Sequence, residues 1–358
     1  MANATLATDR IAATDHRVPH VSTVPAIAGQ GTAIFVREKR RADAAAGPPV
    51  LMVHGGISHG TLAFDLPHAT YSWMDDLARA GFTAYALDMT GYGRSARPMM
   101  DDPLNLPPAQ RKEIGLDSQA PAPYPFELVS SRSEWDEIDR VVEFIRARHG
   151  GGPINLLGWS GGGKRTGSYA SLYPEKVARL VIFASSNYAS DGPDAPPAQL
   201  PRPGFAMTIQ SRLVAEEKRW NPYLRCPGQI EPEMKDVIWR EMMASDPIGA
   251  GWGAGVMRAP VRSYWGWNRA AARRIAAPTL IMIGEFDELL PSNRALYGDL
   301  GIADKAMLEI DCGSHFMLWE MQHRVLHQAA REWLAAGTLL GKKQGLFGAD
   351  AQGRITAR

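Results

Sequence analysis

The amino-acid sequence predicts an α/β fold, a mostly parallel β-sheet with helices packed on both faces. Short apolar runs recur along the chain and alternate with segments of helical periodicity. Within these runs polar residues do not alternate with apolar ones, which is typical of strands buried on both faces of a parallel sheet. Active sites in such sheets lie at the carboxyl ends of the strands, so those loops are where we look for chemistry.

Length and composition agree with this class. A chain of 358 residues buries a large core and needs no disulfide or metal for stability. Its 45% hydrophobic and 22% charged residues exclude a disordered, collagenous or coiled-coil protein. The 39 basic and 38 acidic side chains leave a net charge of +1, which argues against nucleic acid or an anionic membrane as principal partner.

Targeting and redox signals favour the cytoplasm. The N-terminal segment lacks the basic stretch and apolar run of a signal peptide, and no apolar run reaches the roughly 18 residues of a membrane span. Cys226 and Cys312 are too few for a disulfide framework, so we expect two free thiols. We therefore expect a cytoplasmic protein that acts on a small molecule. The sequence leaves a homo-oligomer open.

The expected elements follow one another in regular order. Residues 1–30 are polar, alanine-rich and aperiodic, which indicates a loose N-terminal arm. Proline and glycine bound a buried strand at 49–53, and Gly81 ends a helix at 71–80. Five apolar residues at helical spacing predict another helix at 134–148. The other expected strands cover residues 31–37, 83–87, 154–157, 180–184, 279–283 and 305–310, and further helices follow Gly163 and span residues 319–334.

Two long stretches interrupt this alternation. Residues 96–131 contain seven prolines, too many for a helix or an inner strand, and predict a surface excursion long enough to cover the site. Residues 190–275 have helical patterns of their own and hold five of the ten tryptophans. These tryptophans either line the apolar inner face of a lid or form the insertion's own core. The chain then divides into a core of residues 31–189 and 276–338, this lid, and a C-terminal tail of residues 339–358.

A strand-to-helix turn carries the strongest chemical signal. Residues 158–162 read Gly-Trp-Ser-Gly-Gly, which matches G-x-S-x-G at the end of an expected strand. A serine on so sharp a turn has strained backbone geometry, and the glycines two residues to either side let the neighbouring chain approach closely. The following helix directs backbone N–H groups toward an anion that forms beside Ser160. Ser160 is therefore the candidate nucleophile.

Three other patterns suggest a cofactor or a metal, and each is incomplete. Residues 158–165 match the phosphate-binding G-x-x-x-x-G-K-[ST] loop except that Arg165, which cannot ligate magnesium, replaces the hydroxyl residue. Residues 91–96 fit part of a dinucleotide fingerprint, but prolines rather than a helix follow them. His323 and His327 lie one helical turn apart without a third ligand nearby, so we place them on a solvated helix face. We expect no cofactor and no metal.

A general base and the acid that orients it are expected after Ser160. Asp287 lies in the loop after the strand at 279–283, and His315 lies in a glycine-containing loop after the strand at 305–310. The order serine, acid, histidine is the one found in α/β-hydrolases. His315 would take the proton from Ser160, and Asp287 would fix the imidazole tautomer and stabilise its cation. The alternative acids are Glu285, Glu288 and Asp191.

The loop after the strand at 49–53 offers an oxyanion hole. It reads His54-Gly55-Gly56, and a tetrahedral intermediate needs two preplaced donors for its negative oxygen. We expect these donors to be the backbone N–H groups of Gly56 and Gly161. Trp159, beside the nucleophile, is the candidate substrate contact.

These loops together resemble the α/β-hydrolase superfamily over about residues 31–338. Besides the serine, acid, histidine and oxyanion loops, residues 88–95 read Asp-Met-Thr-Gly-Tyr-Gly-Arg-Ser and are similar to the family's D-x-x-G-x-G-x-S turn. The resemblance implies an eight-stranded sheet and a helical lid inserted before the acid strand, where residues 190–275 lie.

The sequence departs from the family pattern at three places. The oxyanion turn lacks the proline of H-G-x-P and the third glycine of H-G-G-G. The proline-rich excursion is longer than usual. Lys164 and Arg165 put positive charge in the first turn of the nucleophile helix, where the helix dipole disfavours each by roughly 0.3 to 1 kcal/mol. The sequence alone offers no reason for these two cations.

A serine nucleophile implies acyl transfer and argues against the epoxide hydrolases and haloalkane dehalogenases of this superfamily, which use aspartate. We expect hydrolysis of a carboxylic ester, lactone or thioester through an acyl-enzyme on Ser160. Trp159 and the tryptophan-rich lid favour a small to medium apolar or aromatic substrate. The same triad also serves carbon–carbon bond hydrolases, amidases and acyltransferases. The alternative of another class is a ligand-binding receptor on a hydrolase scaffold.

Overall fold

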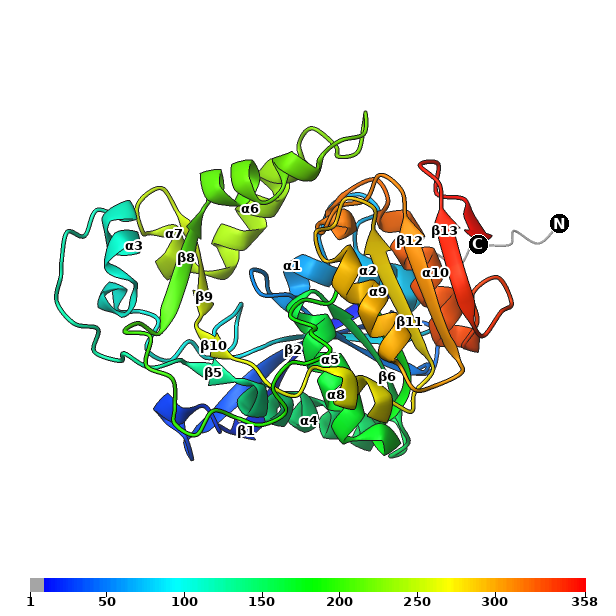
Figure 1. Cartoon of the computed structure of the whole chain (residues 1–358), viewed down its shortest axis with the longest axis horizontal. Helices are drawn as coiled ribbons and strands as arrows, with labels where there is room; N and C mark the ends of the chain where they lie inside the picture. The colour runs from blue at the N-terminus through cyan, green and yellow to red at the C-terminus, as the bar shows by residue number, and fades with distance from the viewer. Residues whose placement is uncertain (1–9) are drawn as a thin grey trace.

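A ten-stranded β-sheet forms the centre of the computed structural model, which describes residues 10–358 (Figure 1). Its strand order is β1-β2-β4-β3-β6-β7-β11-β12-β13-β14, and the seven strands from β4 to β13 are mutually parallel. The α/β prediction is confirmed, with ten strands in place of eight. The strands are β1 (Ile11–Val21), β2 (Gly31–Arg41), β3 (Pro49–Val53), β4 (Thr83–Asp88), β6 (Ile154–Trp159), β7 (Val177–Phe183), β11 (Thr279–Gly284), β12 (Lys305–Ile310), β13 (Gly345–Ala349) and β14 (Ile355–Ala357).

The three strands of this sheet that the sequence analysis did not locate come from the two ends of the chain. Residues 11–21, expected in a loose arm, form β1 and pair antiparallel with β2 along their whole length. Residues 345–357, expected in a tail, contribute β13 and β14. The edge strands β1 and β14 each have a single buried residue, and β13, inside the edge, is a five-residue strand with two glycines, so the hydrophobic pattern of all three is weak. The signal-peptide expectation rests on residues 1–9, which lie outside the described residues.

Helices cover the sheet in two layers (Figure 1). Helices α2 and α10 contact each other on one face, while α4, α5, α8 and α9 follow one another in contact on the other. Helix α4 begins at Ser131 because Ser130 caps it, exchanging hydrogen bonds with Ser133. The helices are α1 (Gly60–Phe64), α2 (Trp73–Arg79), α4 (Ser131–Arg148), α5 (Gly161–Leu172), α8 (Arg269–Arg274), α9 (Leu290–Asp299) and α10 (His323–Ala336).

The proline-rich excursion and the insertion together form one body, which we call the cap (residues 96–131 and 190–263; Figure 1). Buried apolar side chains from both segments share a second hydrophobic cluster. Arg111 is buried in the excursion and donates to four backbone carbonyls of residues 104–120, which holds this irregular chain in place. The cap contains α3 (Pro108–Glu113), α6 (Met234–Ser245), α7 (Pro247–Ala250), the hairpin β8 (Met207–Ser211) and β9 (Val256–Pro260), and the parallel pair β5 (Val129–Ser130) and β10 (Arg262–Ser263).

The cap thus differs from the expected helical lid in two respects. It contains β-structure, and residues 264–275 already belong to the core, where α8 packs against α5. Three of the insertion's tryptophans contact the core, and the first, Trp220, donates its indole N–H to Glu320. Trp265 packs against Trp135, and the indole N–H of Trp267 donates to Ser185.

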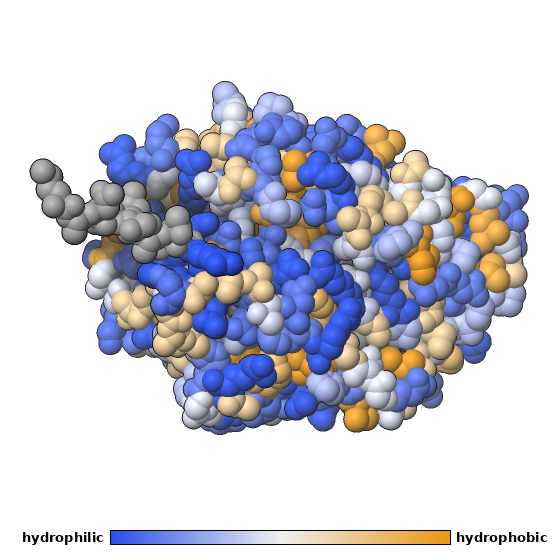
Figure 2. Space-filling view, turned by 180° about the vertical axis from the view of Figure 1, so that it is seen from behind, coloured by the Kyte–Doolittle hydropathy of each residue, from blue (hydrophilic) through white to orange (hydrophobic). Residues whose placement is uncertain are grey.

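On the face opposite to Figure 1, hydrophilic residues predominate and hydrophobic ones are scattered (Figure 2). Within residues 10–358 no helix is both long and apolar enough to cross a membrane.

Candidate active site

Ser160 occupies the strained turn between β6 and α5. Its φ and ψ are 55° and −117°, a region that residues with a side chain rarely adopt. The flanking glycines are required by close packing. A Cβ on Gly158 would lie 2.3 Å from the carbonyl oxygen of Gly162, and one on Gly162 would lie 1.8 Å from that of Val53. The spacing of G-x-S-x-G therefore reflects contact between the turn and the neighbouring strand β3.

The three predicted catalytic side chains meet at the carboxyl edge of the sheet. The Nε2 of His315 lies 2.9 Å from the Oγ of Ser160, and its Nδ1 lies 2.9 Å from Oδ2 of Asp287. The Asp287 side chain is fully buried, and its Oδ1 accepts the backbone N–H of Leu289. This chain of hydrogen bonds has the geometry by which a serine hydroxyl is deprotonated by an oriented imidazole.

The alternative acids make other contacts. Glu285 is exposed and accepts the backbone N–H of Cys312, and Glu288 is exposed and accepts the hydroxyl of Tyr223. Asp191 is exposed as well. Of the four candidate acids, only Asp287 forms a hydrogen bond with His315.

The expected oxyanion donors lie side by side beneath Ser160. A Cβ on Gly161 would lie 3.5 Å from the backbone nitrogen of Gly56, and one on Gly55 would lie 3.1 Å from the Cβ of Ser160. Gly161 is the first residue of α5, so its N–H has no partner within the helix. Neither of these two N–H groups donates to any acceptor among residues 10–358. Both line the cavity in front of Ser160 and are free to bind an oxygen there.

The structure explains the cations at the start of α5. Arg165 is fully buried and donates from Nη1 to the carbonyl oxygens of His54 and Gly55, at 2.8 and 3.3 Å. Its Nη2 donates to Glu134 of α4 at 2.7 Å, and the Lys164 Nζ lies 3.3 Å from the other oxygen of that carboxylate. The pair therefore ties the nucleophile helix to the oxyanion loop. Sequence reasoning missed Glu134, because 30 residues separate it from Lys164.

The buried ionisable groups around Arg165 differ in how strongly they are ionised. Burial opposes ionisation of Glu134, but Arg165 and Lys164 outweigh it and hold the pKa of the carboxyl well below its ordinary value. Burial lowers the pKa of Lys164 to about 7, although Glu134 opposes this shift. Burial also raises the pKa of Glu137 to about 7. Near neutral pH the cluster thus has one firmly ionised carboxylate.

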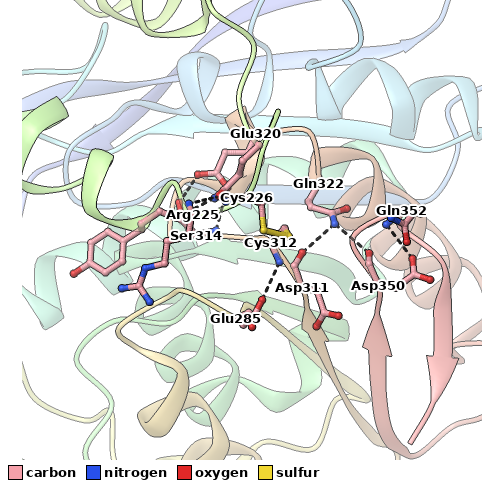
Figure 3. The surroundings of a disulfide bond; sticks show 12 residues. Arg225, Cys226, Glu285, Asp311, Cys312, Ser314, Glu320, Gln322, Asp350 and Gln352 are labelled. Carbon is pink, nitrogen blue, oxygen red and sulfur yellow. Dashed lines mark hydrogen bonds between the residues drawn. A yellow bond between two sulfur atoms is a disulfide. The ribbon is translucent and has the colours of Figure 1, made fainter.

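A disulfide joins the cap to the histidine loop (Figure 3). Cys226 and Cys312 are bonded, so the prediction of two free thiols is wrong. The two residues are 86 positions apart, and only the packing of the cap on the core brings them together. Cys312 comes three residues before His315, and the bond therefore holds one end of the histidine loop against the cap.

The buried carboxylate of Glu320 holds the other end of that loop. It accepts the backbone N–H and the hydroxyl of Ser314 from the loop, the indole N–H of Trp220 and the side-chain amide of Gln229 from the cap. Burial raises the pKa of Glu320, while these four donors oppose the shift. The histidine loop is thus bound to the cap by a covalent bond and a buried polar network.

Trp159 contributes to the same support. It is almost fully buried and donates from its indole N–H to the carbonyl oxygen of His315 at 3.1 Å. Trp159 is also among the residues that line the cavity, and its contact with a substrate remains a prediction. Of the five tryptophans in the insertion, all within the described residues, none lines this cavity.

The cavity in front of Ser160 has a volume of about 740 Å³ and lies between the core and the cap. Its aromatic lining consists of Trp159, Tyr223, Tyr264, Phe286 and Phe316. Its charged lining consists of Lys218, Arg219, Arg262 and Glu288, and His315 lines it as well.

The predicted histidine pair is not at the surface. His323 bonds to the Thr70 hydroxyl and the Glu320 carbonyl, and His327 stacks on Trp73, so both are buried and the expected solvated face is wrong. Elsewhere, His68, Glu231 and Glu233 bring their ligand atoms within 4.8 Å of one another. These three side chains, of which Glu233 is exposed, could hold a metal ion, but they do not line the cavity of Ser160.

Known proteins share the fold and the sequence pattern. A 48-residue stretch is 46% identical to the poly(3-hydroxyalkanoate) polymerase subunit PhaC of Haloferax mediterranei, over 13% of this chain and about a tenth of that protein. The pimeloyl-[acyl-carrier protein] methyl ester esterase of Chromobacterium violaceum is 22% identical over 270 residues, which are 75% of this chain and 87% of that protein. The structure of a thermophilic esterase from Thermogutta terrifontis superposes with a TM-score of 0.52 at 20% identity, over 89% of this chain and 98% of that one.

The family described as the alpha/beta hydrolase fold matches residues 48–321, more than half of the chain. This match includes the oxyanion loop, the nucleophile turn and the loops of Asp287 and His315. The chain therefore belongs to the alpha/beta hydrolase family.

Proposed function

We propose that this protein is a serine hydrolase that cleaves a carboxylic ester, lactone or thioester through an acyl-enzyme on Ser160. The observation that carries the proposal is the continuous hydrogen-bond chain from Asp287 through His315 to the Oγ of Ser160. Two unoccupied backbone donors at Gly56 and Gly161 complete the arrangement that acyl transfer requires.

The steps follow from the positions of these groups. His315 accepts the hydroxyl proton as the Ser160 oxygen attacks the carbonyl carbon, and the N–H groups of Gly56 and Gly161 bind the resulting oxyanion. Asp287 stabilises the imidazolium. The imidazolium then protonates the leaving alcohol oxygen or thiol sulfur, which completes the acyl-enzyme. Water attacks the acyl carbon as His315 takes its proton, and return of that proton to the Oγ of Ser160 releases the carboxylic acid.

The cavity supports a small to medium substrate. Its volume of about 740 Å³ is in the range of sites that enclose such molecules, and its aromatic side chains favour an apolar body. The esterase relative from Chromobacterium violaceum supports an ester over an amide or a carbon–carbon bond. The intact contact between Ser160 and His315 favours catalysis over a receptor with an inactive triad.

The test is the intact mass of the protein after exposure to a fluorophosphonate, with Ser160→Ala treated alike. We expect one adduct on the natural protein and none on the variant, and hydrolysis of short esters that the variant loses almost entirely. Retention of more than a few per cent of turnover by Ser160→Ala would refute the mechanism. Saturable ligand binding without an adduct or product would favour the receptor.

A further inference from the structure

We propose that Arg262 binds an anionic group on the acyl part of the substrate, so that the preferred substrates are esters whose acyl group carries a carboxylate. This inference rests on the proposed esterase function and specifies its substrate class. It starts from a cation in the wall of the active-site cavity that no acidic side chain neutralises.

Arg262 is held firmly beside the oxyanion loop. It lies on β10, which pairs with β5, and its Nη2 donates to the carbonyl oxygen of Gly56 at 3.2 Å. A Cβ on Gly56 would lie 2.8 Å from that Nη2, so the glycine lets the guanidinium approach the loop. The rings of Tyr92 and Tyr264 have their centres 5.8 and 5.7 Å from its Cζ. These contacts position the side chain before a substrate arrives.

The charge of Arg262 has no acidic partner. Among residues 10–358, no carboxylate oxygen lies within 4.0 Å of it, and the Gly56 carbonyl is the one acceptor of its hydrogen bonds, which leaves the buried Nη1 without a partner. The nearby carboxylate of Glu134 is already shared by Arg165 and Lys164. A half-buried cation is ordinarily paired, because desolvating an unpaired charge is unfavourable. An anionic ligand would supply the missing partner.

Basic side chains outnumber acidic ones in the rest of the cavity lining. Lys218 and Arg219 line its exposed part, and neither has a carboxylate within 4.0 Å among the described residues. The acidic residue of the lining, Glu288, accepts the hydroxyl of Tyr223. The cavity therefore attracts anions through its exposed cations and offers them a guanidinium beside Gly56.

The position of Arg262 assigns the anion to the acyl part. The leaving oxygen must face Nε2 of His315 to receive its proton, whereas Arg262 contacts the oxyanion loop at Gly56. Because the N–H of Gly56 binds the carbonyl oxygen in the proposed mechanism, a carboxylate at Arg262 lies a few bonds from the reacting carbon. Half-esters of short dicarboxylic acids have this form.

The experiment compares the monomethyl with the dimethyl esters of succinate, glutarate and adipate by methanol release. For the natural protein we expect kcat/KM for at least one half-ester to exceed that for its dimethyl ester about tenfold or more. Arg262→Met should reduce this preference about 10- to 100-fold, the size expected for a lost charge-assisted hydrogen bond. Arg262→Lys should keep part of it. Arg240→Met, which removes an exposed cation of α6 outside the cavity, should keep all of it.

Two results would overturn the inference. The natural protein could prefer all three dimethyl esters, or Arg262→Met could slow both members of each pair equally, which would make Arg262 a positioning residue of the oxyanion loop. In the variant the Tyr92 hydroxyl still donates to Gly56 O, so the loop keeps a donor, and turnover of the dimethyl esters reports that it is folded. Absence of methanol from every ester, with no fluorophosphonate adduct, would instead refute the proposed function and this inference with it.

Discussion

Cys226 of the cap is bonded to Cys312, three residues before His315 in the histidine loop. The disulfide closes a segment of 86 positions that contains the end of the cap, α8, β11 and the Asp287 loop. The same junction contains Glu320, whose carboxylate joins Ser314 of the loop to Trp220 and Gln229 of the cap. The position of His315 thus depends on how the cap packs against the core.

Removing the disulfide should therefore affect stability and catalysis together. For the Cys226→Ser, Cys312→Ser double variant we expect the free energy of unfolding to fall by about 3 to 5 kcal/mol and kcat to fall as the histidine loop loosens. Urea titrations and ester turnover measure the two effects. A reductant should reproduce both in the natural protein and change nothing in the double variant. An equal effect of the reductant on both proteins would contradict a role for this bond.

Asp287→Asn should lower kcat about 10³- to 10⁴-fold while leaving KM and the fold nearly unchanged, because the amide no longer fixes the imidazole tautomer or stabilises its cation. Steady-state kinetics on a short ester tests this. Glu285→Gln is the matched control, since Glu285 is exposed and contacts Cys312 rather than His315. A similar loss in both variants would mean that Asp287 is not the orienting acid.

Gly162→Ala should destabilise the protein by about 3 kcal/mol or more and abolish ester turnover, because the new Cβ would lie 1.8 Å from the carbonyl oxygen of Val53. Chemical unfolding and circular dichroism measure the loss. Gly152→Ala, at a position with open space around the Cβ and no positive φ, should change the stability by no more than about 0.5 kcal/mol. A stable, active Gly162→Ala protein would show that the turn does not need this contact.

Arg165→Met should cost about 3 to 5 kcal/mol of stability, because it leaves the buried carboxylate of Glu134 without its main partner. Adding Glu134→Leu should restore a large part of that loss, since Lys164 has a pKa of about 7 and can lose its proton. Turnover should stay low in both variants, because the carbonyls of His54 and Gly55 lose their donor. A double-mutant cycle in urea, run beside ester kinetics, separates the two effects. Additive losses would contradict a coupled pair.

His327 should make stability depend on pH. Burial, with smaller contributions from His323 and Arg331, holds its pKa well below the ordinary 6.5. Below pH 6.5 the unfolded chain therefore binds one more proton at this site than the folded chain, and stability falls as pH falls. His327→Leu should remove this pH dependence. The free energy of unfolding of the variant, minus that of the natural protein, should therefore rise by about 1.4 kcal/mol for each pH unit below 6.5. Urea unfolding of both proteins at pH 7.5, 6 and 5 measures this difference. A difference that does not change with pH would contradict the prediction.

The sequence by itself determined the parallel sheet and the loops that contain Ser160, Asp287 and His315. The central strands are continuous apolar runs, and their burial on both faces makes them recognisable without a structure. The nucleophile turn is equally local, because steric limits at Ser160 require glycine two residues to either side. The expected order of Ser160, Asp287 and His315 therefore places them at one sheet edge, where the structure brings them within hydrogen-bond distance.

Tertiary structure alone decided the features that join distant parts of the chain. The pairing of Cys226 with Cys312, the partnership of Arg165 with Glu134 and the approach of Arg262 to Gly56 link residues between 31 and 206 positions apart. The sequence did not predict the edge strand β1 for a related reason. This strand is held mainly by its pairing with β2 and has no buried apolar face that a sequence pattern could report. Local patterns report steric and hydrophobic preferences within a few residues, whereas these contacts exist only once the cap has folded onto the core.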